Sequence, residues 1–214
     1  MEVVILLIFR VYHKYYFAIN RAFNMIQIID ERDAANKLCK IIQQNLPKKY
    51  KVETGRNVCY CAKIKGYSDN GLAIFEEASG KKYKYQTDIC ISKVEEDNSC
   101  NIYIPEIIIE TKLKSYSSHD VITYSEKALA HKKLHPNLKY GFVVIEPEDN
   151  KLQSRFFAHN FGFDFAFLLN LNDESETEFF IKKIIRKLLN SNTLEKNQAI
   201  KGFVNFSETY PVKS

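Results

Sequence analysis

Residues 105–112 place an acid and an amine side by side at the end of an apolar strand. Side chains two apart in a strand point to the same face, so Glu110 and Lys112 project together. The run of isoleucines at 107–109 indicates that this strand, predicted over 102–114, is buried on both faces within a sheet. Because burying an ion is costly unless it is paired or bound to a metal, the charged pair suggests a chemical site.

A second carboxylate precedes this pair on the chain. Asp88 lies in a predicted strand over residues 83–94, with apolar residues after it. If this strand pairs with the next through the polar turn at 95–101, Asp88 and Glu110 lie opposite each other. Residues paired on one face have Cβ atoms roughly 4.5–5.5 Å apart, close enough for both carboxylates to hold one cation. Magnesium prefers such oxygen ligands and keeps several waters, one of which could act as the nucleophile.

The elements that must position these residues follow from the hydrophobic pattern and from helix caps. We predict a helix over 33–46, strands over 57–66, 83–94 and 102–114, a helix from Ser117 or Ser118 to Leu134, a strand over 140–145, a further strand within 156–171, and a helix opened by a capping box at Ser175 and Glu178. This order predicts a single α/β domain over residues 25–214, with a central mixed sheet flanked by helices. Residues 1–24 are either an upstream extension or a lid segment on that domain.

Asp88 and the Glu110-Thr111-Lys112 segment resemble the PD-(D/E)xK nuclease superfamily, which contains most type II restriction endonucleases. The family core has the α-β-β-β-α-β order that residues 33–145 show, and residues 110–127 look like restriction enzymes in particular. One departure is Thr87, which stands where the family name has a proline that is often missing.

The resemblance implies a restriction-endonuclease-like fold and a set of roles. Asp88 and Glu110 would ligate Mg²⁺, with the Thr111 carbonyl as a further ligand. Lys112 would position and polarise the attacking water and help to stabilise charge at the phosphorus. The expected activity is a Mg²⁺-dependent endonuclease that hydrolyses phosphodiester bonds in double-stranded DNA and leaves a 5′-phosphate.

Family habit further predicts a homodimeric type II restriction enzyme. The alternatives are a structure-specific or non-specific repair nuclease or junction resolvase of the same fold, and a catalytically silent nucleic-acid-binding module. An isolated ExK segment occurs by chance in many chains rich in Glu and Lys, and as a surface ion pair it would contribute little. The prediction therefore depends on its combination with the apolar strand, the strand carrying Asp88 and the following helix.

Further acids are candidates for an additional metal ligand. Glu106 lies on the predicted strand face of Glu110 and is either a substitute ligand or an ion-paired or solvated glutamate. Members of the family often add an acid from the first helix or the loop after it, where Glu31 and Glu53 are available, and the alternative for each is a plain surface position.

The helix after the ExK segment offers side chains that could hold a DNA backbone. Tyr124, Ser125 and Lys127 are these candidates, and the alternative is a solvated basic helix face. The histidines match no zinc spacing, which predicts surface or capping roles for them: His119, His131, His135 and His159.

Composition adds weaker constraints. The net charge is +5, from 31 Lys and Arg against 26 Asp and Glu, which suits a polyanionic partner without requiring one. Five cysteines without a CxxC pair indicate neither a disulfide framework nor a structural zinc site, and a reducing cytoplasm fits best. The apolar run at 3–9 is too short to span a bilayer and lacks a basic region before it, so we expect neither a membrane association nor a secretory signal.

Overall fold

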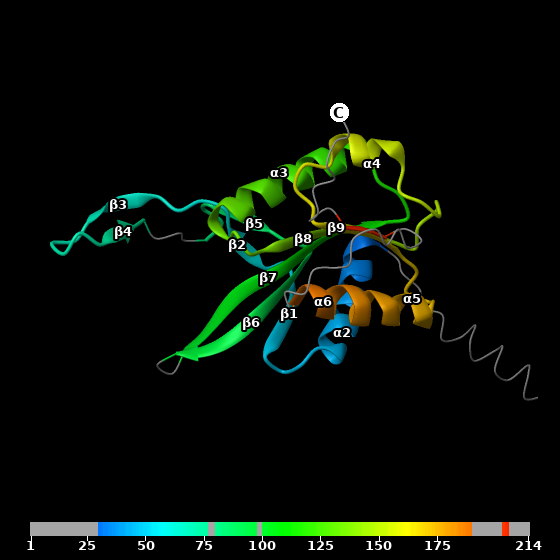
Figure 1. Cartoon of the computed structure of the whole chain (residues 1–214), viewed down its shortest axis with the longest axis horizontal. Coiled ribbons are helices and arrows are strands. Elements are labelled where there is room, and N and C mark those ends of the chain that lie inside the picture. Colours follow the sequence, from blue (N-terminus) through cyan, green and yellow to red (C-terminus); the bar gives the residue numbers. More distant parts are fainter. Residues whose placement is uncertain (1–29, 77–79, 98–99, 190–202, 206–214) are drawn as a thin grey trace, which may run out of the picture.

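A six-stranded mixed sheet lies between two layers of helices (Figure 1). The computed structural model describes residues 30–76, 80–97, 100–189 and 203–205. Its elements are α2 (Glu31–Asn45), β1 (Tyr50–Thr54), β2 (Asn57–Cys59), β3 (Ile64–Tyr67), β4 (Ala73–Phe75), β5 (Lys84–Gln86), β6 (Ile89–Asp97), β7 (Cys100–Leu113), α3 (Ser118–Leu134), β8 (Lys139–Ile145), α4 (Ser154–His159), β9 (Phe165–Leu169), α5 (Glu174–Phe179), the π-helical segment η1 (Phe180–Ile185), α6 (Arg186–Leu189) and β10 (Phe203–Asn205).

The strand order of the sheet is β1-β6-β7-β8-β9-β10. The first three strands pair antiparallel, whereas β7, β8 and β9 run parallel and β10 returns antiparallel to β9. Parallel neighbours need crossover connections, and α3 and α4 supply them. The predicted α/β class, with a central mixed sheet flanked by helices, is confirmed.

Each face of the sheet has its own apolar core. Helices α2, α5 and α6 lie on one side of the sheet, and α3 and α4 lie on the other (Figure 1). Ile107 and Ile109 belong to the first core and Ile108 to the second, and all three side chains are fully buried. The predicted burial of this strand on both faces is therefore confirmed.

The helix starts follow from their caps. The Asp30 side chain accepts a hydrogen bond from the Asp33 N–H at 2.7 Å, so α2 begins two residues earlier than predicted. Ser117 caps α3 in a capping box with Asp120, as one of the two predicted starts required. The predicted capping box at Ser175 is wrong, because the Asp173 carboxylate accepts the N–H groups there and starts α5 one residue earlier.

The strand boundaries differ more. The sequence prediction missed β1, the short edge strand that pairs with β6. The predicted strand over 57–66 is two strands, β2 and β3, neither of which joins the main sheet. The predicted strand over 83–94 likewise divides into β5 and β6 on either side of Thr87 and Asp88.

Two further predictions meet the limits of the described residues. None of the helices described is both long and apolar enough to cross a membrane. The interpretation of residues 1–24 falls outside the described ranges, and so does any role for Met25 as the start of the domain.

Candidate active site

Asp88 lies directly before β6 and is fixed to the end of β7. The β6–β7 register pairs Ile89 with Ile109, and one further step along this register places Asp88 opposite Glu110. The Oδ2 atom of Asp88 accepts hydrogen bonds from the Thr111 backbone N–H at 2.8 Å and from the Thr111 hydroxyl at 3.2 Å. The strands that were predicted to form a hairpin therefore bring Asp88 to the expected place.

Glu110 is the most deeply buried carboxyl group at this end of the sheet. Its side chain is 0% exposed, although one oxygen, Oε2, has no hydrogen-bond partner among the described residues. The other oxygen, Oε1, accepts a hydrogen bond from the Tyr140 hydroxyl at 2.8 Å and lies 3.6 Å from the Lys127 ammonium. Burial, followed by the nearby negative charge of Asp88, raises the pKa of Glu110 to about 8.

This pair of carboxyl groups fits a hard cation. Two adjacent acids, one of them buried with a free oxygen, are costly to ionise together unless a positive charge joins them. The Thr111 N–H points towards Asp88, and a strand residue directs its N–H and C=O to the same side, so the Thr111 carbonyl faces the same region. Among the described residues no third His, Cys, Asp or Glu completes a metal cluster, so water would have to fill the remaining positions around a Mg²⁺ ion.

Lys112 has other partners than the two carboxylates. Its ammonium lies 3.0 Å from Glu31 at the start of α2 and 3.2 Å from Asp120 at the start of α3. Burial acts to lower the pKa of Lys112, but the hydrogen bonds to Glu31 and Tyr124 outweigh it and raise that pKa above its usual range. The lysine is therefore held as a cation at the mouth of the site.

Lys127 is the lysine closest to Glu110 among the printed contacts of that carboxylate. It comes from α3, and its ammonium also donates to the Gln86 carbonyl at 3.3 Å. The Tyr124 ring lies between the two lysines, with the Lys112 and Lys127 ammonium nitrogens 5.2 Å and 4.8 Å from its centroid. Burial, aided by the charge of Asp88, raises the pKa of Tyr124 to about 12.

A pocket of about 620 Å³ opens beside these residues. It lies where the first turns of α2 approach the end of β1 and the start of β6. Its walls combine acidic, basic and small polar side chains: Glu31, Arg32, Ala35, Asn36, Thr54, Gly55, Gln86, Thr87, Asp88, Thr111 and Lys127. The pocket therefore gives a polar ligand access to Asp88 and to the strand that carries Glu110.

Two of the candidate accessory acids lie elsewhere. Glu53 forms ion pairs with Lys51 and Arg56. Glu106 lies at the irregularity in the β6–β7 register, where its pKa is raised by burial and lowered by the lysines near it. Neither lines the pocket with Asp88, whereas Glu31 does.

Two sequence interpretations on α3 need correction. Ser125 is fully buried and bonded to the loop after α4, through the His159 carbonyl and the Phe161 N–H, so it does not reach a surface where DNA could lie. His131 is also fully buried: its Nε2–H donates to the Val58 carbonyl at 3.1 Å, and burial lowers its pKa to about 4. The predicted surface or capping role of His131 is wrong.

Tyr140 is a site residue that the sequence prediction missed. It stands near the start of β8, where its alternation with Phe142 resembles an ordinary buried strand face. The strand register pairs Glu110 with Phe142, not with Tyr140, so strand spacing alone did not indicate the hydrogen bond. A buried tyrosine generally needs a partner for its hydroxyl, and this was the available signal.

The remaining side-chain predictions are simple to report. All five cysteines are free, as the absence of a disulfide pattern suggested. Neither a protein-family model nor a curated protein sequence matches the chain.

Proposed function

We propose that this protein is a Mg²⁺-dependent endonuclease that hydrolyses phosphodiester bonds in double-stranded DNA. The observation that carries the proposal is the pair of carboxyl groups from Asp88 and Glu110, which converge at the end of β7 with one buried oxygen unpartnered. Lysines on both sides of the Tyr124 ring, in and beside a polar pocket, add a binding region for a polyanion.

Each group around the pair has a defined part in this proposal. Asp88, Glu110 and the Thr111 carbonyl would hold the ion. Bound there, Mg²⁺ would polarise a phosphoryl oxygen and lower the pKa of a bound water. The Thr111 N–H orients the carboxylate of Asp88, and the Tyr140 hydroxyl orients that of Glu110.

The lysines supply positive charge and do not act as bases. Because its pKa is raised, Lys112 stays protonated at neutral pH and can only donate a proton or a hydrogen bond. That state suits the stabilisation of charge on a phosphoryl oxygen and the orientation of an attacking water. Lys127, whose ammonium lies within 3.6 Å of Glu110, is placed to accompany the phosphate that approaches the ion.

The finer assignment is a type II restriction endonuclease that acts as a homodimer. Its support is the resemblance of Asp88 and the Glu110-Thr111-Lys112 segment to the PD-(D/E)xK superfamily, together with the order of helices and strands from α2 to β8. A repair nuclease or junction resolvase of the same fold would use the same residues on a different DNA structure.

A nucleic-acid-binding module without cleavage is a second candidate. The observation that favours it is the ion pairing of Lys112 with Glu31 and Asp120, which directs its charge to two other carboxylates. Such a module would retain duplex DNA in the presence or absence of Mg²⁺ and would leave it intact.

The test is a cleavage assay on plasmid and on defined linear and branched duplexes, with Mg²⁺ or with a chelator. The proposal expects Mg²⁺-dependent cleavage, which Asp88→Asn reduces at least ~100-fold because a metal ligand is lost. Asp149→Asn is the matched control, since this exposed aspartate lies in the loop after β8, and it should cut like the wild type.

The pattern of products separates the candidates. Discrete fragments support a restriction enzyme, and a preference for ends or junctions supports a repair nuclease. Retention of DNA without cleavage supports the silent module. Cleavage by Asp88→Asn at the wild-type rate would remove Asp88 from the site.

A further inference from the structure

A two-stranded arm projects from the domain and exposes apolar side chains. The arm consists of β3, β4 and their connecting turn, residues 64–75, and it extends well away from the main sheet (Figure 1). Its large apolar residues are between 46% and 69% exposed: Ile64, Tyr67, Leu72, Ile74 and Phe75. An isolated ribbon of this kind is marginally stable in water, and a cluster of exposed apolar residues marks an interaction site.

The strand register gathers three of these residues on one face. Ile64 pairs with Phe75, and Tyr67 pairs with Ala73. Because residues 73 and 75 are two apart on one strand, both pairs point to the same side of the ribbon. Ile64, Tyr67 and Phe75 thus form one apolar face that no described part of the chain covers.

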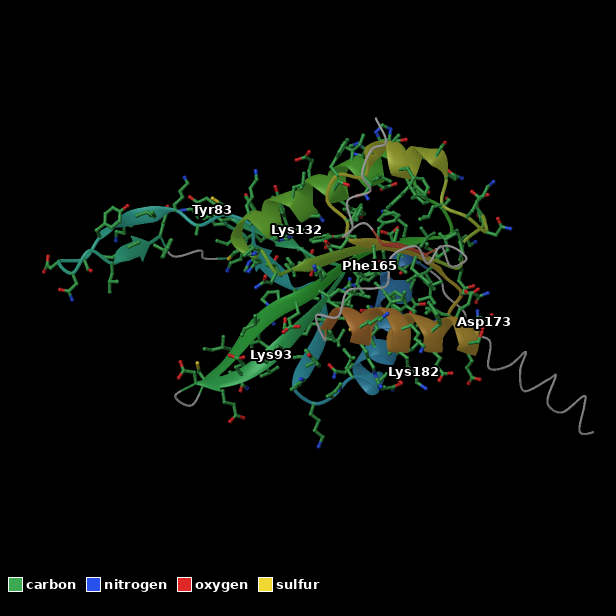
Figure 2. The ribbon with its side chains drawn as sticks, viewed as in Figure 1. Tyr83, Lys93, Lys132, Phe165, Asp173 and Lys182 are labelled. Carbon is green, nitrogen blue, oxygen red and sulfur yellow. The ribbon has the colours of Figure 1, made fainter. Side chains whose placement is uncertain are left out.

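The base of the arm is firmly attached to the domain. The Tyr60 and Tyr85 rings stack with centroids 4.1 Å apart, where β2 and β5 pair. His131 and His135 on α3 bond to the carbonyls of Val58 and Cys59 at 3.1 Å. Figure 2 shows the arm with its side chains standing away from the domain, beyond Tyr83 at its base. The arm is therefore held outwards by a fixed base.

The arm and its base are basic, whereas a second projection is acidic. Lys65 on β3 and Lys81 beside the base are exposed and form no ion pair with a described residue. At the far end of the β6–β7 hairpin, which carries Lys93 in Figure 2, Glu96 and Asp97 are exposed and likewise unpaired among the described residues. The same hairpin exposes apolar side chains on β7, namely Ile102 and Ile104.

We propose that the arm is a self-association surface, which docks on the far end of the β6–β7 hairpin of a second copy, with the reciprocal contact made by the partner's arm. Charge complementarity selects this partner, because lysines meet carboxylates while the exposed apolar residues of both projections are buried together. Two arms packed on each other would bring lysine against lysine. A DNA duplex would use the lysines, but its phosphates would leave the apolar face without a partner.

The apolar contribution can be tested by sedimentation of the full chain over a range of concentrations. The proposal expects a wild-type dimer and a double variant, Ile64→Ser with Phe75→Ser, whose dimer dissociation constant rises at least ~100-fold, about tenfold for each buried side chain lost. The matched control is Ile122→Ser with Phe161→Ser, which removes one exposed Ile and one exposed Phe outside the arm and should leave the dimer unchanged.

Charge reversal tests which surfaces meet. Lys65→Glu with Lys81→Glu makes the arm and its base acidic, and Glu96→Lys with Asp97→Lys makes the hairpin basic. Each variant alone should be monomeric at concentrations where the wild type is dimeric, since both reciprocal contacts then join like charges. An equimolar mixture of the two should dimerise, because every contact joins opposite charges again.

Three outcomes overturn the proposal: a monomeric wild type, variants that associate like the wild type, or a mixture that stays monomeric. In the second case, a loss of duplex DNA binding by the acidic-arm variant would identify the arm as a DNA-binding element instead. Mg²⁺ binding at Asp88 and Glu110 is measured separately, so failure of the dimer and failure of the proposed metal site are distinguishable.

Discussion

The two ends of the β6–β7 ladder carry the same kinds of side chain and put them to different uses. At one end Asp88 and Glu110 lie opposite each other, and Glu110 is completely buried. At the other end Glu95 and Glu96 are exposed to water, and Glu95 pairs with Lys93. Burial beside a second acid makes a carboxyl group hard to ionise, so it favours a cation, whereas an exposed carboxylate is stabilised by water and needs no partner.

Glu106 lies between these extremes and sharpens the comparison. It is on the same strand as Glu110 and partly buried, so burial raises its pKa too, but the charges of Lys93 and Lys49 act against this shift. No second acid from a facing strand completes a pair, because the register irregularity falls at this point. Two glutamates four residues apart on one strand thus differ in the chemistry open to them.

The largest effect expected from this difference is on metal binding. Glu110→Gln should weaken Mg²⁺ binding at least ~100-fold, since it removes a charged ligand of the ion. Glu106→Gln, on the same strand, should change it by no more than about twofold. Isothermal titration calorimetry at pH 8 measures both. Equal losses would show that the burial of Glu110 does not distinguish the two acids.

The pH dependence of stability tests the burial of Glu110 without a metal. Its pKa is raised from 4.5 to about 8, so the folded protein binds the proton more tightly than the unfolded chain does. The stability that this protonation contributes is fully present below pH 4.5 and is lost as the pH rises through about 8. Relative to Glu110→Gln, the wild type in a chelator should lose on the order of a few kcal/mol of unfolding free energy between pH 5 and pH 9.

Urea unfolding at several pH values measures this difference, in which the titration of other groups such as His131 cancels. Glu95→Gln is the control, because this exposed residue should leave the pH profile of the wild type unchanged. Added Mg²⁺ should flatten the profile by compensating the ionised pair. A difference between wild type and Glu110→Gln that does not vary with pH would mean that Glu110 titrates like an exposed acid.

The central part of the fold was predictable because local signals agree with the tertiary structure. Three consecutive isoleucines predict a strand buried on both faces, and Ser117 predicts the start of α3. The edge strand β1 was missed because five residues give a weak pattern. Alternation over 57–66 could not reveal that these residues leave the sheet, since a strand has the same pattern whichever neighbour it pairs with.

The candidate site was predictable to the extent that one hairpin determines it. A turn between neighbouring strands sets the register, so the approach of Asp88 to Glu110 follows from the sequence. The partners of Lys112 do not, because Glu31 is 81 residues away and meets it only once α2 packs on the sheet. The burial of Ser125 likewise depends on α4, which falls in an apolar segment where a strand was predicted.

The smallest expected effect comes from Tyr140, whose hydroxyl donates to the buried carboxylate. Tyr140→Phe removes the 2.8 Å hydrogen bond to Glu110 Oε1 and should cost about 1 kcal/mol of unfolding free energy. This hydrogen bond also lowers the pKa of Glu110, so its loss makes the group harder to ionise. Mg²⁺ affinity should therefore fall severalfold at pH 7 and less at pH 9, where Glu110 is ionised in either chain.

Tyr116→Phe is the matched control for this prediction. Tyr116 is similarly buried, and its hydroxyl accepts a hydrogen bond from the Gln153 N–H at 2.9 Å, far along the chain from the carboxyl pair. Its removal should also cost about 1 kcal/mol, yet leave Mg²⁺ affinity unchanged at both pH values. Equal Mg²⁺ affinity in the two variants would show that Tyr140 only packs in the core. A selective loss in Tyr140→Phe would show that the buried end of the ladder is tuned by its hydrogen-bond donors as well as by burial.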